Sequence, residues 1–83
     1  MEILPSNSLV LKKLKKYGLQ KKFDKQTRLL EGNIYHPSLN VELLEPKKMG
    51  LYSFRIDRKY RAIFIFRNKN SVIEVLNVTV HYN

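Results

Sequence analysis

The chain lacks cysteine entirely, and it lacks long apolar runs. Without cysteine it can form neither a disulfide framework nor a thiolate metal site, and nothing in its composition places it outside a reducing cytoplasm. No apolar run approaches the ~18 residues that a membrane-spanning helix requires. Lysines interrupt the apolar residues near the N-terminus, so no signal-peptide core is present. We therefore expect a soluble cytoplasmic domain that does not associate with membranes.

Acidic residues are also few. The 83 residues include 16 Lys and Arg but only 7 Asp and Glu, which gives a formal net charge of +9. Solubility alone accounts for a net charge of about 2–8 in a small domain. The excess, together with the clustering of arginines, favours a polyanionic partner, either a nucleic acid or an acidic protein.

The first half of the chain carries helical signals. Residues 1–4 can form a short first strand closed by a proline. Ser6 or Asn7 is a suitable N-cap for a first amphipathic helix, and Gly18 is suited to end it. A second amphipathic stretch follows and terminates at Gly32. Two short helices joined at a glycine predict a helical hairpin.

The second half changes to the period of two that is typical of strands. We predict strands at 41–44, 51–56, 60–66 and 71–82, with a turn at 57–59 that lacks the usual glycine. With 43% hydrophobic residues in 83, there is room for a single core. The sequence thus predicts one α+β domain spanning residues 1–83, in which the N-terminal helical hairpin packs on a twisted antiparallel β-meander.

Two arginines lie within the predicted hairpin strands. Alternation sends Arg55 to the face opposite the aromatic residues, and pairing around the turn brings Arg61 near it. A plain structural interpretation is ion pairing with Asp57 or Glu74, or stems that cover apolar surface. Like charges close together on one face repel, however, and this repulsion is tolerated mainly where an anion neutralises it. Phosphate is the expected anion.

These residues occur in segments that resemble a known family. "HPSLNVELLEPKKMGLYSFRIDRKYRAIFIF" and the ending "LNVTVHY" resemble the RelE/ParE superfamily of toxins from bacterial and archaeal toxin–antitoxin systems. The resemblance implies a compact α+β fold and a cognate antitoxin as partner. Most branches of the superfamily are ribosome-dependent mRNA interferases, whereas the ParE branch poisons DNA gyrase.

The ending is most similar to that of the YoeB branch. In that branch a glutamate acts as general base, an arginine stabilises the phosphate, and a C-terminal His-Tyr pair supplies acid and positioning groups. Ungapped superposition of the "FRI…YR" segments puts Glu42 at the glutamate position and Arg61 at the arginine position. Arg55 becomes a second cationic group, and His81 and Tyr82 match the ending.

These residue types suit RNA cleavage without a metal or cofactor. The reaction needs a base for the 2′-OH proton, cationic donors for the phosphorane and an acid for the departing 5′-oxygen. The chain has no cysteine and only two distant histidines, which makes a metal site unexpected. Further cationic residues near the predicted site are candidates to bind the RNA backbone: Lys47, Lys48 and Arg58.

Plainer interpretations remain open. Glu42 can be an exposed strand residue that pairs with a lysine, and His81 and Tyr82 can be a solvated chain end. The lysines of the helices can form a solvated face, or they can hold rRNA phosphates.

We expect mRNA in the ribosomal A site as substrate and an antitoxin-linked hetero-oligomer. The alternative is a ParE-like toxin that inhibits gyrase without nuclease activity.

Overall fold

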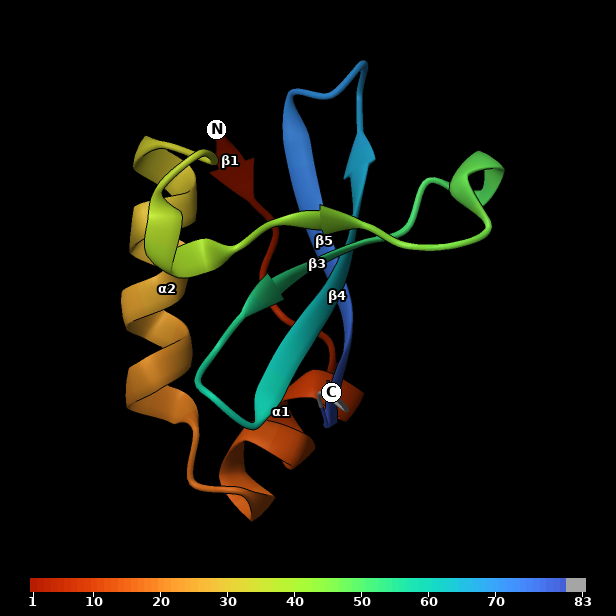
Figure 1. Ribbon diagram of the computed structural model, residues 1–83. Coiled ribbons are helices and arrows are strands. Elements are labelled where there is room, and N and C mark those ends of the chain that lie inside the picture. The colour runs from red at the N-terminus through yellow and green to blue at the C-terminus, as the bar shows by residue number, and fades with distance from the viewer. Residues whose placement is uncertain (81–83) are drawn as a thin grey trace.

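The computed structural model describes residues 1–80 of the chain (Figure 1). Its elements follow one another as β1 (Glu2–Ile3), α1 (Ser8–Lys16), α2 (Gln20–Gly32), the 3₁₀ turn η1 (Pro37–Leu39), β2 (Glu42–Leu43), the 3₁₀ turn η2 (Lys47–Met49), β3 (Tyr52–Arg55), β4 (Tyr60–Arg67) and β5 (Val72–Val80). Figure 1 shows α2 running beside the sheet, with α1 below it. The predicted α+β fold class is confirmed.

In the described residues the strands form one five-stranded sheet in the order β1-β5-β4-β3-β2. The strands β2 to β5 pair antiparallel with their sequence neighbours, as the predicted meander requires. The short first strand also forms, but it pairs parallel to β5 and makes the sheet mixed. This crossover pairing is non-local, so the period-two pattern of the meander could not predict it.

The helix ends follow the local signals in the sequence. The Asn7 side chain accepts a hydrogen bond from the Val10 N–H at 2.8 Å and thus caps α1. Gly18 follows α1 with φ +66°, a left-handed conformation that favours glycine. The last residue of α2 is Gly32, as predicted. One buried residue of α2 is polar: Gln26 donates to two main-chain carbonyls, which satisfies its amide.

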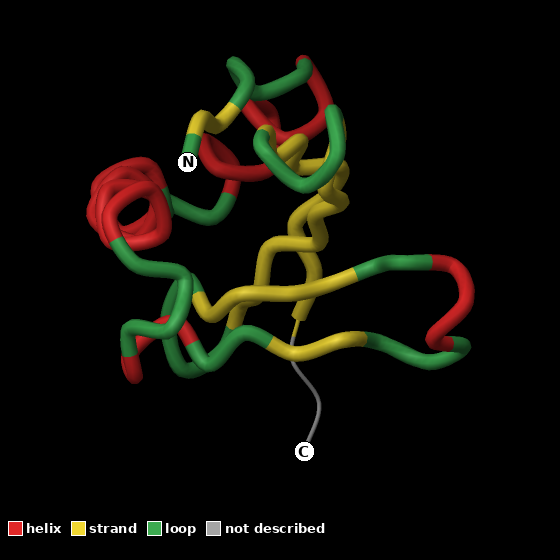
Figure 2. Tube along the Cα trace, turned by 90° about the horizontal axis from the view of Figure 1, so that it is seen from above, coloured by secondary structure: helices red, strands yellow, loops and turns green. Residues whose placement is uncertain are grey.

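The core lies between the helices and one face of the sheet, and Figure 2 shows α2 end-on beside the strands. Phe54, Ala62 and Val78 are register partners across three strands and are buried on this face. The buried apolar side chains of the core are Val10, Leu14, Leu19, Phe23, Leu30, Leu39, Phe54, Ile56, Ala62, Phe64, Ile73, Val75 and Val78. Because alternate side chains of a strand point to opposite faces, Arg55 and Arg61 lie on the other face of the sheet, as predicted.

The turn between β3 and β4 closes without glycine. One carboxylate oxygen of Asp57 accepts hydrogen bonds from the main-chain N–H groups of Lys59 and Tyr60, both at 2.8 Å. The other oxygen pairs with Lys22 of α2 at 3.0 Å. An aspartate that accepts hydrogen bonds from main-chain N–H groups two and three residues ahead stabilises a turn. The turn can therefore form without the glycine that is usual in such hairpins.

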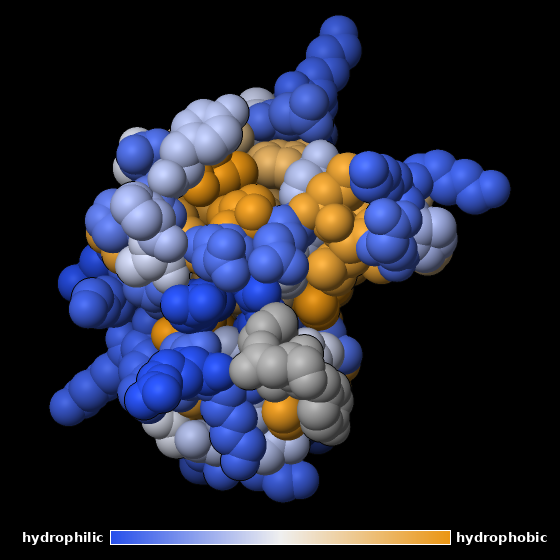
Figure 3. Space-filling model, viewed as in Figure 1, coloured by the Kyte–Doolittle hydropathy of each residue, from blue (hydrophilic) through white to orange (hydrophobic). Residues whose placement is uncertain are grey.

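The connection from β2 to β3 projects from the body as an arm, with η2 at its tip (Figure 2). Leu43 at the end of β2 and Met49 on the arm are exposed, and Figure 3 shows apolar surface on this side of the molecule between hydrophilic side chains. Within the described residues, neither helix has the length and apolar character needed to cross a bilayer.

Candidate functional site

Arg61 is buried although it carries a full charge. It lies on β4, which is flanked on both sides by other strands, and only 4% of its surface is exposed. Its Nη2 donates to the main-chain carbonyl of Asn40 at 2.6 Å, and its Nη1 lies 3.4 Å from Oε1 of Glu42. A buried guanidinium requires such partners, because removing its hydration without compensation is costly. These contacts hold the cation in one orientation.

The strand register builds a pocket above this arginine. Glu42, Ser53 and Ile63 are partners across β2, β3 and β4, and Arg61 is the partner of Thr79 on β5. The pocket has a volume of about 290 Å³ and is lined by Glu42, Leu44, Ser53, Arg61, Ile63, Thr79 and Val80. We call it the Arg61 pocket. It opens on the sheet face that the helices do not cover.

Glu42 stands at the rim of the Arg61 pocket. About half of its side chain, 49%, is exposed. Besides its contact with Arg61, its Oε1 accepts a hydrogen bond from the Asn40 side-chain amide at 3.3 Å. Both contacts are long for charge-assisted interactions, so the carboxylate remains free to accept another donor. The structure thus brings together Glu42 and Arg61, two of the predicted site residues.

Two polar atoms of the Arg61 pocket have no hydrogen-bond partner among the described residues. They are Nε of Arg61 and Oγ of Ser53, and both are buried. Unsatisfied buried donors are uncommon in folded proteins, and each one reduces stability. A ligand with acceptor oxygens in this pocket would satisfy both atoms.

Arg55 lies in a different environment from Arg61. The two are register partners, yet Arg55 is exposed. It lines a neighbouring depression of about 310 Å³, together with Lys22, Lys25, Gln26, Ser38, Ile56, Asp57 and Arg58. We call this the Arg55 depression. Within residues 1–80, no ion pair involves Arg55 or Arg58.

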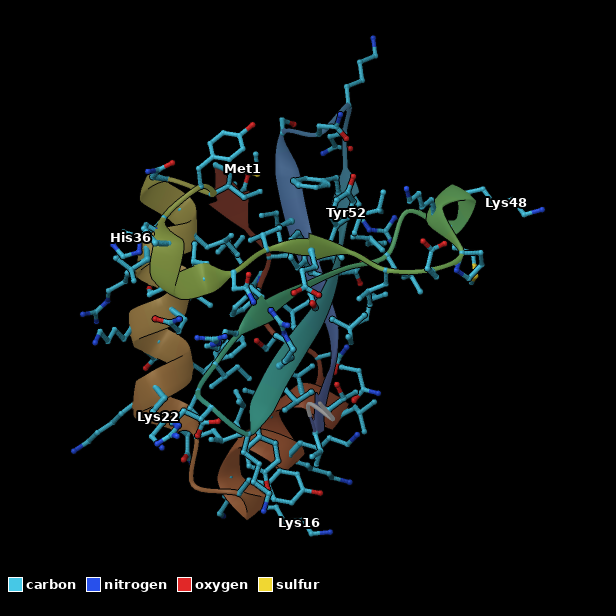
Figure 4. The ribbon with its side chains drawn as sticks, in the orientation of Figure 1. Met1, Lys16, Lys22, His36, Lys48 and Tyr52 are labelled. Carbon is cyan, nitrogen blue, oxygen red and sulfur yellow. The ribbon has the colours of Figure 1, made fainter. Side chains whose placement is uncertain are left out.

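The carboxylates expected to neutralise these arginines are engaged elsewhere. Asp57 pairs with Lys22, which lies beside the β3–β4 turn (Figure 4), and Glu74 pairs with Arg67. Burial by itself would raise the pKa of the Asp57 carboxyl. The hydrogen bonds from the Tyr60 and Lys59 N–H groups and from Lys22 outweigh that effect and hold its pKa below the ordinary value.

The remaining predicted site residues lie outside the Arg61 pocket or outside the described part of the chain. Lys47 and Lys48 lie on η2, and Figure 4 shows Lys48 at the tip of the arm, pointing away from the sheet. Neither lysine lines the pocket. His81 and Tyr82 lie outside the described residues, and Val80, which precedes them in sequence, lines the pocket.

The other histidine has a structural contact. The Nδ1 atom of His36 accepts a hydrogen bond from the Ser38 N–H at 3.2 Å and caps η1. In the part of the chain that the structure describes, no three His, Cys, Asp or Glu side chains gather as a metal site would require.

Sequence reasoning assigned no role to Asn40 or Ser53. Asn40 has a left-handed φ of 45°, which turns its carbonyl toward Arg61, and no local pattern signals such a contact. Ser53 could have been found, because it lies two residues before Arg55 on the same strand face.

No family model and no curated protein matches this sequence. Solved structures do match its fold. A YoeB/ParE toxin from Agrobacterium tumefaciens superposes with a TM-score of 0.73 at 17% identity, covering 99% of this chain and 100% of that one. The YoeB-YefM toxin–antitoxin heterotetramer from Staphylococcus aureus matches with 0.70 at 18% identity, and the YoeB dimer from the same species with 0.68 at 19%; each covers 99% of this chain and 98% of the other. The chain therefore has the fold of the YoeB and ParE toxins, as its sequence predicted.

Proposed function

We propose that this protein is the toxin of a toxin–antitoxin system and that it cleaves mRNA on the ribosome as a metal-free endoribonuclease. The observation that carries the proposal is the Arg61 pocket, in which a half-exposed carboxylate lies 3.4 Å from a buried guanidinium. A base beside a fixed cation is the pair that attack of a 2′-hydroxyl on its own phosphodiester requires. The shared fold of the YoeB/ParE toxins supports the toxin role.

In this mechanism Glu42 accepts the proton of the 2′-OH as the 2′-oxygen bonds to phosphorus. Arg61 stabilises the negative charge that develops on the phosphorane oxygens. The bond from phosphorus to the 5′-oxygen then breaks, and the leaving oxygen takes a proton from His81, with Tyr82 as a positioning group. The products are a 2′,3′-cyclic phosphate and a 5′-hydroxyl end.

Other cations would bind the RNA on either side of the scissile bond. Arg55 and Arg58 line the depression next to the Arg61 pocket, so they are suited to an adjacent phosphate. Lys47 and Lys48 on the arm would reach phosphates further along the strand or in rRNA. The net charge of +9 favours such contacts, which would weaken with rising salt.

The partner that neutralises the toxin would be an antitoxin. One matched structure is a YoeB-YefM toxin–antitoxin heterotetramer. The excess of 16 basic over 7 acidic residues suits an antitoxin segment rich in Asp and Glu. We expect the two proteins to form a hetero-oligomer in the cytoplasm.

Primer extension on a reporter mRNA tests the activity directly. The wild-type protein should cut the message when ribosomes are present and leave it intact without them. Glu42→Gln and His81→Ala should each reduce the cleavage rate by at least about 100-fold, because each removes one of the two proton-transfer groups. Glu31→Gln makes the same carboxylate-to-amide change at an exposed end of α2 and serves as the matched control.

Cleavage at the wild-type rate in both active-site variants would overturn the nuclease assignment. Growth arrest with intact mRNA and broken DNA would instead support the gyrase-directed alternative.

A further inference from the structure

The unsatisfied atoms of the Arg61 pocket suggest a ligand contact that goes beyond the catalytic set proposed above. Ser53 and Arg61 are 1% and 4% exposed, and among the described residues Oγ and Nε have no hydrogen-bond partner. A core serine normally bonds to a main-chain carbonyl or to a neighbouring side chain. Here the hydroxyl remains unpaired although glutamate and threonine side chains line the same pocket.

The sheet places the two residues as diagonal neighbours. Ser53 is the register partner of Ile63, and Arg61 is the partner of Arg55, so Ser53 and Arg61 are offset by two residues on adjacent strands and share a face. Diagonal neighbours lie about 7–8 Å apart and are within reach of long side chains. A hydroxyl and a guanidinium at this spacing can bind one multi-oxygen group between them.

The donors define the chemistry of that group. The Arg61 Nε–H can only donate, and the Ser53 hydroxyl can donate to an acceptor in the same pocket. The fixed cation favours an anion, and a tetrahedral oxyanion offers several acceptors to donors that converge from different directions. A phosphodiester meets all three conditions.

We infer that Ser53 Oγ and Arg61 Nε together bind the non-bridging oxygens of the phosphodiester in the Arg61 pocket. Ser53 is then a phosphate-binding residue of the same site. That the phosphate belongs to RNA rests on the proposed function, whereas the binding of a phosphate group does not. Both atoms are buried in the free protein, so the pocket must widen before a phosphate reaches them. Glu42 at its rim is half-exposed and held by contacts of 3.3 and 3.4 Å, so a small shift can admit the phosphate while the carboxylate stays beside it.

The test separates the phosphate site from the nuclease activity. The protein is titrated with inorganic phosphate while the NMR signal of the Arg61 Nε–H is followed, and the same variants are then assayed for mRNA cleavage. Phosphate should shift this signal in the wild type. Ser53→Ala should weaken phosphate binding roughly tenfold, because a hydrogen bond to a charged group is lost.

A pair of isosteric variants guards against a change in packing. Ser53→Thr keeps the hydroxyl and Ser53→Val replaces it with a methyl group, so the difference in their phosphate affinities isolates the hydrogen bond. We expect the valine variant to bind roughly tenfold more weakly than the threonine variant. Ser8→Ala makes the same change as Ser53→Ala at an exposed position of α1 and should alter nothing.

The thermal stability of Ser53→Ala gives an independent readout. Removing an unsatisfied buried hydroxyl should raise the melting temperature, or at least leave it unchanged, while phosphate binding weakens. A lower melting temperature with unchanged phosphate affinity would mean that Ser53 only packs, and it would overturn the inference. If phosphate binding depends on Ser53 but the wild type cleaves no mRNA, the phosphate site is supported and the nuclease proposal fails.

Discussion

Arg55 and Arg61 are register partners on β3 and β4, yet they differ in burial and in the partners of their guanidinium groups. Arg61 is buried with two partners, whereas Arg55 is exposed, and within the described residues no ion pair involves it. The reason is the length of β2, which pairs with β3 at Ser53 and Tyr52 but not at Arg55. The chain around β2 therefore covers the guanidinium of Arg61 and leaves that of Arg55 exposed.

The comparison separates two uses of the same side chain. Arg61 loses its conformational freedom when the protein folds, so it is already oriented when a substrate arrives. Arg55 keeps its freedom and its hydration, so its attraction for a phosphate is weaker and is screened by salt. Under the proposed function, Arg61 is therefore suited to stabilise the reacting phosphate, and Arg55 is suited to bind the RNA strand.

The largest effect is expected for Arg61→Ala. Under the proposed function, cleavage on the ribosome should fall by about 10²–10³-fold, because this variant removes the oriented charge that we assign to the phosphorane. Single-turnover cleavage assays measure the loss, with circular dichroism to verify the fold. Arg61→Lys should recover little, since an ammonium group cannot replace the planar fork. A near-wild-type rate for the lysine variant would remove the distinction between the two arginines.

A smaller effect is expected for Arg55→Ala. RNA affinity should fall, and the slope of log affinity against log salt should become shallower by ~0.7, the value for one phosphate contact to a single strand. The free energy of unfolding should change by less than about 0.5 kcal/mol, as for other surface substitutions. Arg67→Ala removes the same charge where Arg67 pairs with Glu74, and it should leave the salt slope unchanged. Equal salt slopes for the wild type, Arg55→Ala and Arg67→Ala would exclude Arg55 from RNA binding.

The smallest effect on RNA cleavage and binding is expected for Asp57→Ala, which acts on stability by loosening the turn beside the Arg55 depression. The loss of the two main-chain hydrogen bonds should reduce the free energy of unfolding by about 1 kcal/mol at neutral pH. Because the folded-state pKa of Asp57 is lowered, its contribution is present above the ordinary value of 3.8 and is lost as pH falls through the folded pKa. Urea unfolding of both proteins from pH 7 to pH 2 should show their difference shrinking only at the acid end.

Features set by near neighbours were predictable from the sequence. The Asn7 cap, the left-handed Gly18 and the turn at Asp57 each depend on residues within a few positions. The two faces of the sheet were also predictable, because strand alternation requires no knowledge of the partner strands. The resemblance to the toxin family added Glu42 and Arg61, and the structure brings these two together.

The sequence by itself determined the order of helices and strands, the side of the sheet that carries the arginines and the excess of positive charge, because periodicity, capping and composition are local or additive. Only the tertiary structure decided that β1 pairs with β5, that Asn40 and Glu42 contact Arg61, and that Ser53 Oγ finds no hydrogen-bond partner within residues 1–80. These features depend on strand ends and loop carbonyls that lie far apart along the chain. Their meeting follows from how the whole sheet closes over its core, and no short-range pattern encodes it.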